Sequence, residues 1–230
     1  MHAADLLSKR AELTPDRVAL VELETGQRYT YAQLNQRANR LANFMQDQLG
    51  VQSGDRVSIL AKNSITYIDL FYGLPKIGAI FAPFNWRLTA HEIRYMVNDL
   101  EPRVLILEPE FVPTLEAMRG EIQVEHLVSL RGAEIRDAIE YETGLTAAAS
   151  IEPERPSSLD SESPYCILYT SGTTGNPKGA IIPHRQILYN CINTVVSWGI
   201  TERDISPVYT PLFHAGGLFA FLTPILYIGG

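Results

Sequence analysis

The sequence of 230 residues is long enough for one large domain or two small ones, with a core that needs no disulfide bonds. Apolar residues make up 46% and charged residues 20%, which argues against a disordered or fibrous chain. The formal net charge of −7 disfavours nonspecific binding to nucleic acid or to an anionic membrane, because both require basic surfaces. An anionic ligand would therefore have to be bound by a local positive region.

The two cysteines, Cys166 and Cys191, are too few for a disulfide framework and lie among apolar neighbours, so we expect buried free thiols. The most apolar stretch, residues 218–228, contains Pro224 and is far shorter than the about 20 residues of a membrane span. The N-terminus has no apolar core of the kind found in signal peptides. We expect a cytoplasmic protein with no membrane span and no nucleic-acid partner.

Residues 18–30 predict a β-hairpin that turns near Gly26. Thr30 and Gln33 then form a capping-box pattern, in which each residue's side chain bonds to the other's backbone at the start of a helix. Apolar residues recur at helical spacing after this box, and Gly50 is a suitable helix end.

Strand-like and helix-like segments alternate up to residue 130. The expected strands are 56–60, 79–83, 103–107 and 126–130, and the expected helices are 63–76, 89–99 and 109–118. Pro75 should bend the first of these helices or end it early, and Thr89 with Glu92 forms a second capping box. The alternation predicts an α/β fold built from βαβ units, with mostly parallel sheets and flanking helices.

The composition changes between residues 143 and 164, where prolines, serines and acids gather, and we interpret this stretch as a solvated linker or long surface loop. Beyond it we expect strands at 165–169, 179–182 and 207–209, a helix at 185–198 and a last apolar segment at 217–228. We therefore expect two units: a first α/β subdomain with its linker, residues 1–162, and the start of a second α/β subdomain, residues 163–230.

The loop between strands 165–169 and 179–182 combines hydroxyl groups, glycines and a lysine. It reads Thr170-Ser171-Gly172-Thr173-Thr174-Gly175-Asn176-Pro177-Lys178-Gly179. The glycines let successive N–H groups converge on one anion, the hydroxyls add donors, and Lys178 adds a positive charge. No Asp or Glu occurs from Ser163 through Ile200, whereas Lys178 and Arg185 lie in that run. The pattern favours a polyphosphate ligand, and an ordinary flexible hairpin loop is the alternative.

The segment from Tyr169 to Gly179 resembles, without a mismatch, the phosphate-loop signature of the adenylate-forming superfamily, which includes acyl-CoA synthetases, luciferases and adenylation domains. Residues 30–34 (TYAQL), 76–89 (KIGAIFAPFNWRLT) and 211–217 (PLFHAGG) also look like segments of that family. The resemblance covers nearly the whole chain and is closest to fatty-acid-type CoA ligases.

This resemblance implies a two-step reaction. A carboxylate, expected to be a fatty or aryl acid, attacks the α-phosphate of Mg²⁺-bound ATP, and coenzyme A then takes the acyl group from the acyl-adenylate. The resemblance assigns catalytic roles to Lys178 and His214, and places His214 near the acyl pocket. It also implies that the β- and γ-phosphates of ATP are bound by Thr170, Ser171, Gly172, Thr173, Thr174, Gly175 and Lys178. Without it, His214 is equally well explained as a helix-capping or core histidine.

The sequence lacks the later motifs that supply the family's adenine-, magnesium- and ribose-binding residues, its hinge and its C-terminal catalytic lysine, and no residue here is a metal ligand. We therefore expect an N-terminal fragment, either artificially shortened or a split gene product, with little or no adenylation activity of its own. An open sheet edge would favour a homodimer.

Two other functions compete with this one. A non-catalytic module that binds a nucleotide or a partner is the first. An unrelated P-loop NTPase is the second, and the sequence argues against it because glycine, not Ser or Thr, follows Lys178. Trp86 and Trp198 are interpreted as core or rim aromatics, and Asn85 and Arg87 as turn residues.

Overall fold

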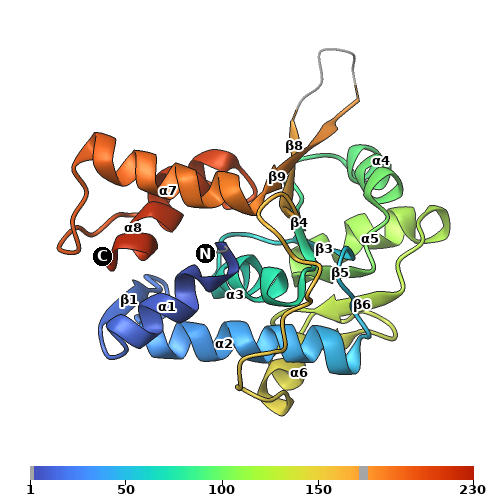
Figure 1. Cartoon of the computed structure of the whole chain (residues 1–230). Helices are drawn as coiled ribbons and strands as arrows, with labels where there is room; N and C mark the ends of the chain where they lie inside the picture. Colours follow the sequence, from blue (N-terminus) through green and yellow to red (C-terminus); the bar gives the residue numbers. More distant parts are fainter. Residues whose placement is uncertain (1–2, 171–175) are drawn as a thin grey trace.

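The computed structural model describes residues 3–170 and 176–230 (Figure 1). Within these residues, seven strands form one sheet in the order β7-β6-β5-β3-β4-β8-β9, and β1 pairs with β2 in a separate antiparallel hairpin. All neighbours in the large sheet are parallel except β8 and β9. The strands are β1 (Val18–Val21), β2 (Arg28–Thr30), β3 (Arg56–Leu60), β4 (Ile80–Pro83), β5 (Val104–Leu107), β6 (His126–Ser129), β7 (Ile139–Glu140), β8 (Pro164–Thr170) and β9 (Lys178–Pro183).

Helices cover both faces of this sheet, which confirms the predicted α/β class. The helices of the described residues are α1 (Leu6–Leu13), α2 (Tyr31–Asn43), α3 (Ile65–Gly73), α4 (Ala90–Leu100), α5 (Val112–Met118), α6 (Tyr141–Ala147), α7 (His184–Trp198) and α8 (Thr223–Ile228). In Figure 1, α4 and α5 lie on one side of the sheet and α2 and α3 on the other. Short π-helical segments, Phe44–Gln48 and Gly216–Leu222, follow α2 and precede α8.

The strands have two buried faces because successive side chains point to opposite sides of the sheet. In β5, Val104 and Ile106 join the larger core with α2 and α3, whereas Leu105 and Leu107 join the smaller core under α4 and α5. On the larger side, α3 lies so close to α2 that a Cβ on Gly73 would come 2.6 Å from the carbonyl oxygen of Ala38. The glycine therefore permits this close packing.

Both capping boxes are confirmed. The backbone N–H of Thr30 donates to Gln33 Oε1 at 2.8 Å and that of Thr89 to Glu92 Oε2 at 2.8 Å, while each threonine hydroxyl accepts the reciprocal bond. Pro75 acts as expected, since α3 ends at Gly73 and a 3-10 helix, Leu74–Ile77, replaces its last turn.

Two expectations need correction. Residues 207–209 form no strand in the described structure, because no other described strand lies beside them. The stretch from 143 to 164 is also not loop throughout, since its start belongs to α6. The sheet itself continues across residues 162–163, because β8 pairs with β4. The division into subdomains 1–162 and 163–230 stays a prediction.

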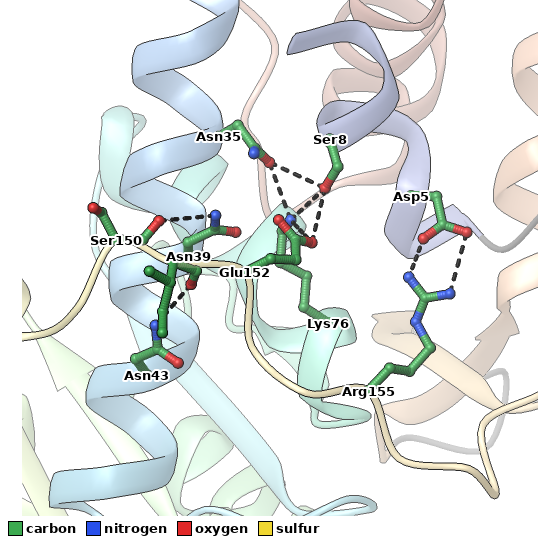
Figure 2. Close-up of polar contacts among 10 residues, drawn as sticks. Asp5, Ser8, Asn35, Asn39, Asn43, Lys76, Ser150, Glu152 and Arg155 are labelled. Carbon is green, nitrogen blue, oxygen red and sulfur yellow. Dashed lines mark hydrogen bonds and ion pairs between the residues drawn. The ribbon is translucent and has the colours of Figure 1, made fainter. Parts of the chain in front are cut away.

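After α6 the chain crosses α2 in an irregular segment, residues 149–155, which we call the strap (Figure 2). The side-chain amide of Asn39 donates to the carbonyl of Ser150 at 3.1 Å, and that of Asn43 donates to the carbonyls of residues 149 and 151. At the far end Arg155 forms an ion pair with Asp5. Polar side chains of α2 and the N-terminal segment thus fix the strap.

The centre of the strap is held by a buried lysine (Figure 2). Lys76 Nζ lies 2.6 Å from Glu152 Oε1, and it also donates to Asn35 Oδ1 at 3.0 Å and to the hydroxyl of Ser8 at 2.5 Å. The Lys76 side chain is 1% exposed and that of Glu152 is 47% exposed. Burial lowers the pKa of Lys76, and the hydrogen bond and charge of Glu152 oppose that shift.

Candidate functional site

The predicted phosphate loop connects the antiparallel strands β8 and β9. Thr170 ends β8 and Lys178 begins β9, and the two residues are register partners with exposed side chains. The hydroxyl of Thr170 donates to the carbonyl of Lys178 at 3.5 Å. Ser171, Gly172, Thr173, Thr174 and Gly175 lie outside the described residues. The structure therefore places the first and last predicted phosphate ligands together at the end of a hairpin.

Packing on β8 and β9 fixes the base of this hairpin. The hydroxyl of Tyr169 donates to Asp99 Oδ2 on α4 at 2.7 Å, and its ring contacts that of Phe84. Burial, together with the hydrogen bond and charge of Asp99, raises the pKa of Tyr169 above its ordinary value. A Cβ on Gly179 would come 2.8 Å from Ile167, so the two strands approach closely just beyond Lys178.

The charge around the hairpin differs from the expectation. Arg185 was expected to add to a local positive region, but its Nε lies 2.6 Å from Glu162 Oε1, just before the acid-free run. This ion pair raises the pKa of Arg185 and neutralises much of its field. Lys178 is thus the better placed of the two cations to meet a phosphate.

His214 lies in a tight turn that leads into the π-helical segment Gly216–Leu222, rather than in the core. Its side chain is exposed, and its Nδ1 accepts a hydrogen bond from the backbone N–H of Gly216 at 3.2 Å. A Cβ on Gly217 would come 2.5 Å from the carbonyl oxygen of Pro211, so the turn requires glycine there. The core interpretation is wrong because the side chain is exposed, whereas the local bond to the Gly216 N–H fits the capping interpretation.

The carboxyl ends of β3 and β4 carry residues that the sequence interpretation did not assign to a site. The ring of Trp86 contacts that of Phe213 at 6.3 Å between centroids, and the Arg87 guanidinium carbon lies 4.6 Å from the Trp86 ring centroid. Lys62 Nζ lies 5.8 Å from the same ring and 2.5 Å from Glu110 Oε2. Ligands of parallel α/β sheets bind at this edge, which is the signal that could have identified these residues.

The described residues, 3–170 and 176–230, contain neither a metal-binding cluster nor a membrane-spanning helix. This part of the chain has no group of three or more His, Cys, Asp or Glu side chains that could hold a metal ion. It also has no helix of the length and hydropathy needed to cross a bilayer.

The chain belongs to the AMP-binding enzyme family, whose sequence model matches residues 7–230. It is 34% identical over 223 residues to a feruloyl-CoA synthase of Amycolatopsis sp, covering 96% of this chain and 41% of that protein. It is also 34% identical to the long-chain-fatty-acid–CoA ligase FadD13 of Mycobacterium tuberculosis, covering 93% of this chain and 41% of the relative.

The fold agrees with that of solved CoA ligases. The crystal structure of the anthranilate CoA ligase AuaEII in complex with anthranoyl-AMP superposes with a TM-score of 0.93 at 27% identity. That match covers 100% of this chain and 44% of AuaEII. The chain thus spans about two fifths of the length of the curated relatives named here.

Proposed function

We propose that this chain supplies the triphosphate-binding part of an ATP-dependent carboxylate–CoA ligase. Its relatives are CoA ligases, and the hairpin that joins Thr170 to Lys178 is the observation that carries the proposal. The reaction joins a carboxylate to AMP with loss of pyrophosphate, and the thiol of coenzyme A then displaces AMP to give a thioester. The acids named for the relatives favour an aryl or fatty acid as substrate.

Lys178 and the loop would act on the departing pyrophosphate. When a carboxylate oxygen attacks the α-phosphorus, negative charge builds on the bridging oxygen and on the β- and γ-phosphates. A lysine ammonium, a threonine hydroxyl and backbone N–H groups aimed at this charge would stabilise it in the transition state. The pairing of β8 with β9 and the Tyr169–Asp99 bond hold Thr170 and Lys178, the two described ends of the loop.

Mg²⁺ and coenzyme A are further proposals. We propose that Mg²⁺ binds together with the triphosphate and neutralises part of its charge, as the family resemblance implies. His214 would lie near the acyl group. We also propose a cytoplasmic location, which cell fractionation would test, and a homodimer, which light scattering would test.

The test is ATP–pyrophosphate exchange by the protein in its full encoded length, with single fatty and aryl acids. We expect exchange with at least one acid and a CoA thioester of that acid by mass spectrometry. Lys178→Ala should slow exchange by about 100-fold or more, by analogy with removal of one preorganised transition-state donor. Lys9→Ala, an exposed lysine on α1, is the control and should leave the rate unchanged. Nucleotide binding without exchange for any acid would instead support a non-catalytic module.

A further inference from the structure

We propose that Asn63 is a positioning residue that holds the turn bearing His214; this role rests on the proposed ligase function. Asn63 follows β3 and precedes α3, and its side-chain amide bridges two backbone groups on either side of Pro211. Its Nδ2 donates to the carbonyl of Thr210 at 3.0 Å, and its Oδ1 accepts from the N–H of Leu212 at 2.8 Å.

This bridge has the pattern of a parallel β-ladder. In such a ladder, one residue donates its N–H to a carbonyl of the neighbouring strand and accepts an N–H two residues further along that strand. The side-chain amide of Asn63 offers the same donor and acceptor to Thr210 and Leu212. Asn63 therefore does with its side chain what a neighbouring strand would do with its backbone.

The segment it holds has strand character without a strand partner in the described structure. Residues 205, 207 and 209 are exposed, whereas 206, 208 and 210 are partly buried, which is the two-residue alternation of a strand. The sequence predicts a strand at 207–209, yet none of the described strands pairs with it. Among the described residues, Asn63 thus holds the end of this extended segment through its two hydrogen bonds.

Leu212, whose N–H is bound by Asn63, lies two residues before His214. From Pro211 onward the backbone turns, because the N–H of His214 donates to the carbonyl of Pro211 at 3.1 Å and Gly217 can carry no Cβ. Between them, the Phe213 ring is buried against Trp86. The bridge, the turn and the Phe213 contact together hold the backbone on the N-terminal side of His214, so release of the bridge should let the imidazole move.

The first test measures the bridge itself, by NMR-detected amide hydrogen exchange in the 230-residue chain. Asn63→Ala removes the acceptor of the Leu212 N–H, and this amide should exchange about ten-fold faster or more. Asn63→Asp keeps an acceptor for Leu212 but cannot donate to Thr210, so Leu212 should stay protected. The control is Asn98→Ala, because Asn98 is also exposed and donates to a backbone carbonyl, that of Glu121, away from this turn. Unchanged Leu212 exchange in Asn63→Ala would overturn the proposal.

The second test measures positioning in the protein of full encoded length. Asn63→Ala should lower kcat/KM for the carboxylate in pyrophosphate exchange by about 10- to 100-fold, as expected for a misplaced group, with the KM for ATP unchanged. In a His214→Ala background the same change should have little further effect, because the two residues act as a unit. A full additional loss there, or fast Leu212 exchange with normal kinetics, would reject the role.

The two hypotheses fail differently. If the unaltered protein catalyses no exchange with any acid, the proposed ligase function fails, and the positioning role of Asn63 is rejected with it. In that case accelerated Leu212 exchange in Asn63→Ala still identifies the bridge as a structural contact only.

Discussion

Removal of the Glu152 charge should loosen the strap and destabilise the fold, because it leaves the Lys76 ammonium buried with neutral partners only. Removing one partner of a fully buried ion pair costs about 3–5 kcal/mol, whereas an exposed pair contributes about 0–1 kcal/mol. The Lys76 side chain is 1% exposed but Glu152 is 47% exposed, so solvent screening reduces the larger figure. We expect Glu152→Gln to lower the free energy of unfolding by about 1–3 kcal/mol.

The origin of this loss is tested by a double-mutant cycle. Lys76→Met removes the charge and keeps an unbranched side chain that is one heavy atom shorter, and replacement of buried ion pairs by apolar residues is often neutral or stabilising. With no buried ammonium left, Glu152→Gln should then cost less than about 0.5 kcal/mol. The exposed pair of Lys9 and Glu12 provides the control, and Glu12→Gln should leave stability nearly unchanged.

The assay is urea and thermal unfolding at pH 7, followed by circular dichroism. For a chain of this size, 1 kcal/mol shifts the Tm by about 2–4 °C, so Glu152→Gln should lower it by about 2–12 °C. If Glu152→Gln lowered the free energy of unfolding equally with Lys76 and with Met at position 76, the reasoning would be refuted, because the effect would not depend on the buried charge.

Two more predictions concern pH and packing. Burial alone would raise the pKa of Glu152, but the hydrogen bond and charge of Lys76 lower that pKa below its ordinary value of 4.5. The ionised Glu152 side chain therefore stabilises the fold above pH 4.5, and this stabilisation is lost as the pH falls below that value. Unfolding measured from pH 3 to 10 should therefore show the unaltered chain and Glu152→Gln converging at acid pH, and parallel curves would contradict this. Gly73→Ala should cost about 1–3 kcal/mol in urea unfolding, because its Cβ meets the Ala38 carbonyl oxygen. Gly120→Ala, with open space around its Cα, is the matched control, and equal effects would rule out the contact.

Local signals predicted much of the fold. The apolar runs of β3 and β5 are strands buried on both faces, and the capping boxes at Thr30 and Thr89 open α2 and α4 at the expected residues. These features depend on neighbours in sequence, so the sequence displays them directly. Pairing of β8 with β4 could not be predicted in this way, because it joins segments about 80 residues apart through a single register pair, Phe81 with Cys166.

Contacts between distant segments explain the other differences. Residues 207–209 have strand-like composition, but no strand of the part of the chain that the structure describes pairs with them, and Asn63 instead bonds to the end of this segment. Nothing in the sequence indicates that Lys76 contacts Glu152, because the two residues are 76 positions apart and lie in different elements.

The candidate site was predicted where its residues form a continuous motif. Thr170, Lys178 and His214 belong to such motifs, and the structure places the first two at one hairpin end and the third in an exposed turn. Asn63 and Arg87 were missed as site residues because each is a single polar residue after a strand. Their relation to residues 210–213 exists only in the folded chain.

The most direct test of the central claim is a crystal structure of the protein with ATP. We expect the β- and γ-phosphates to lie within hydrogen-bonding distance of the loop between β8 and β9, with Lys178 Nζ on a phosphate oxygen. A triphosphate bound elsewhere, with Lys178 making no contact to it, would contradict the account.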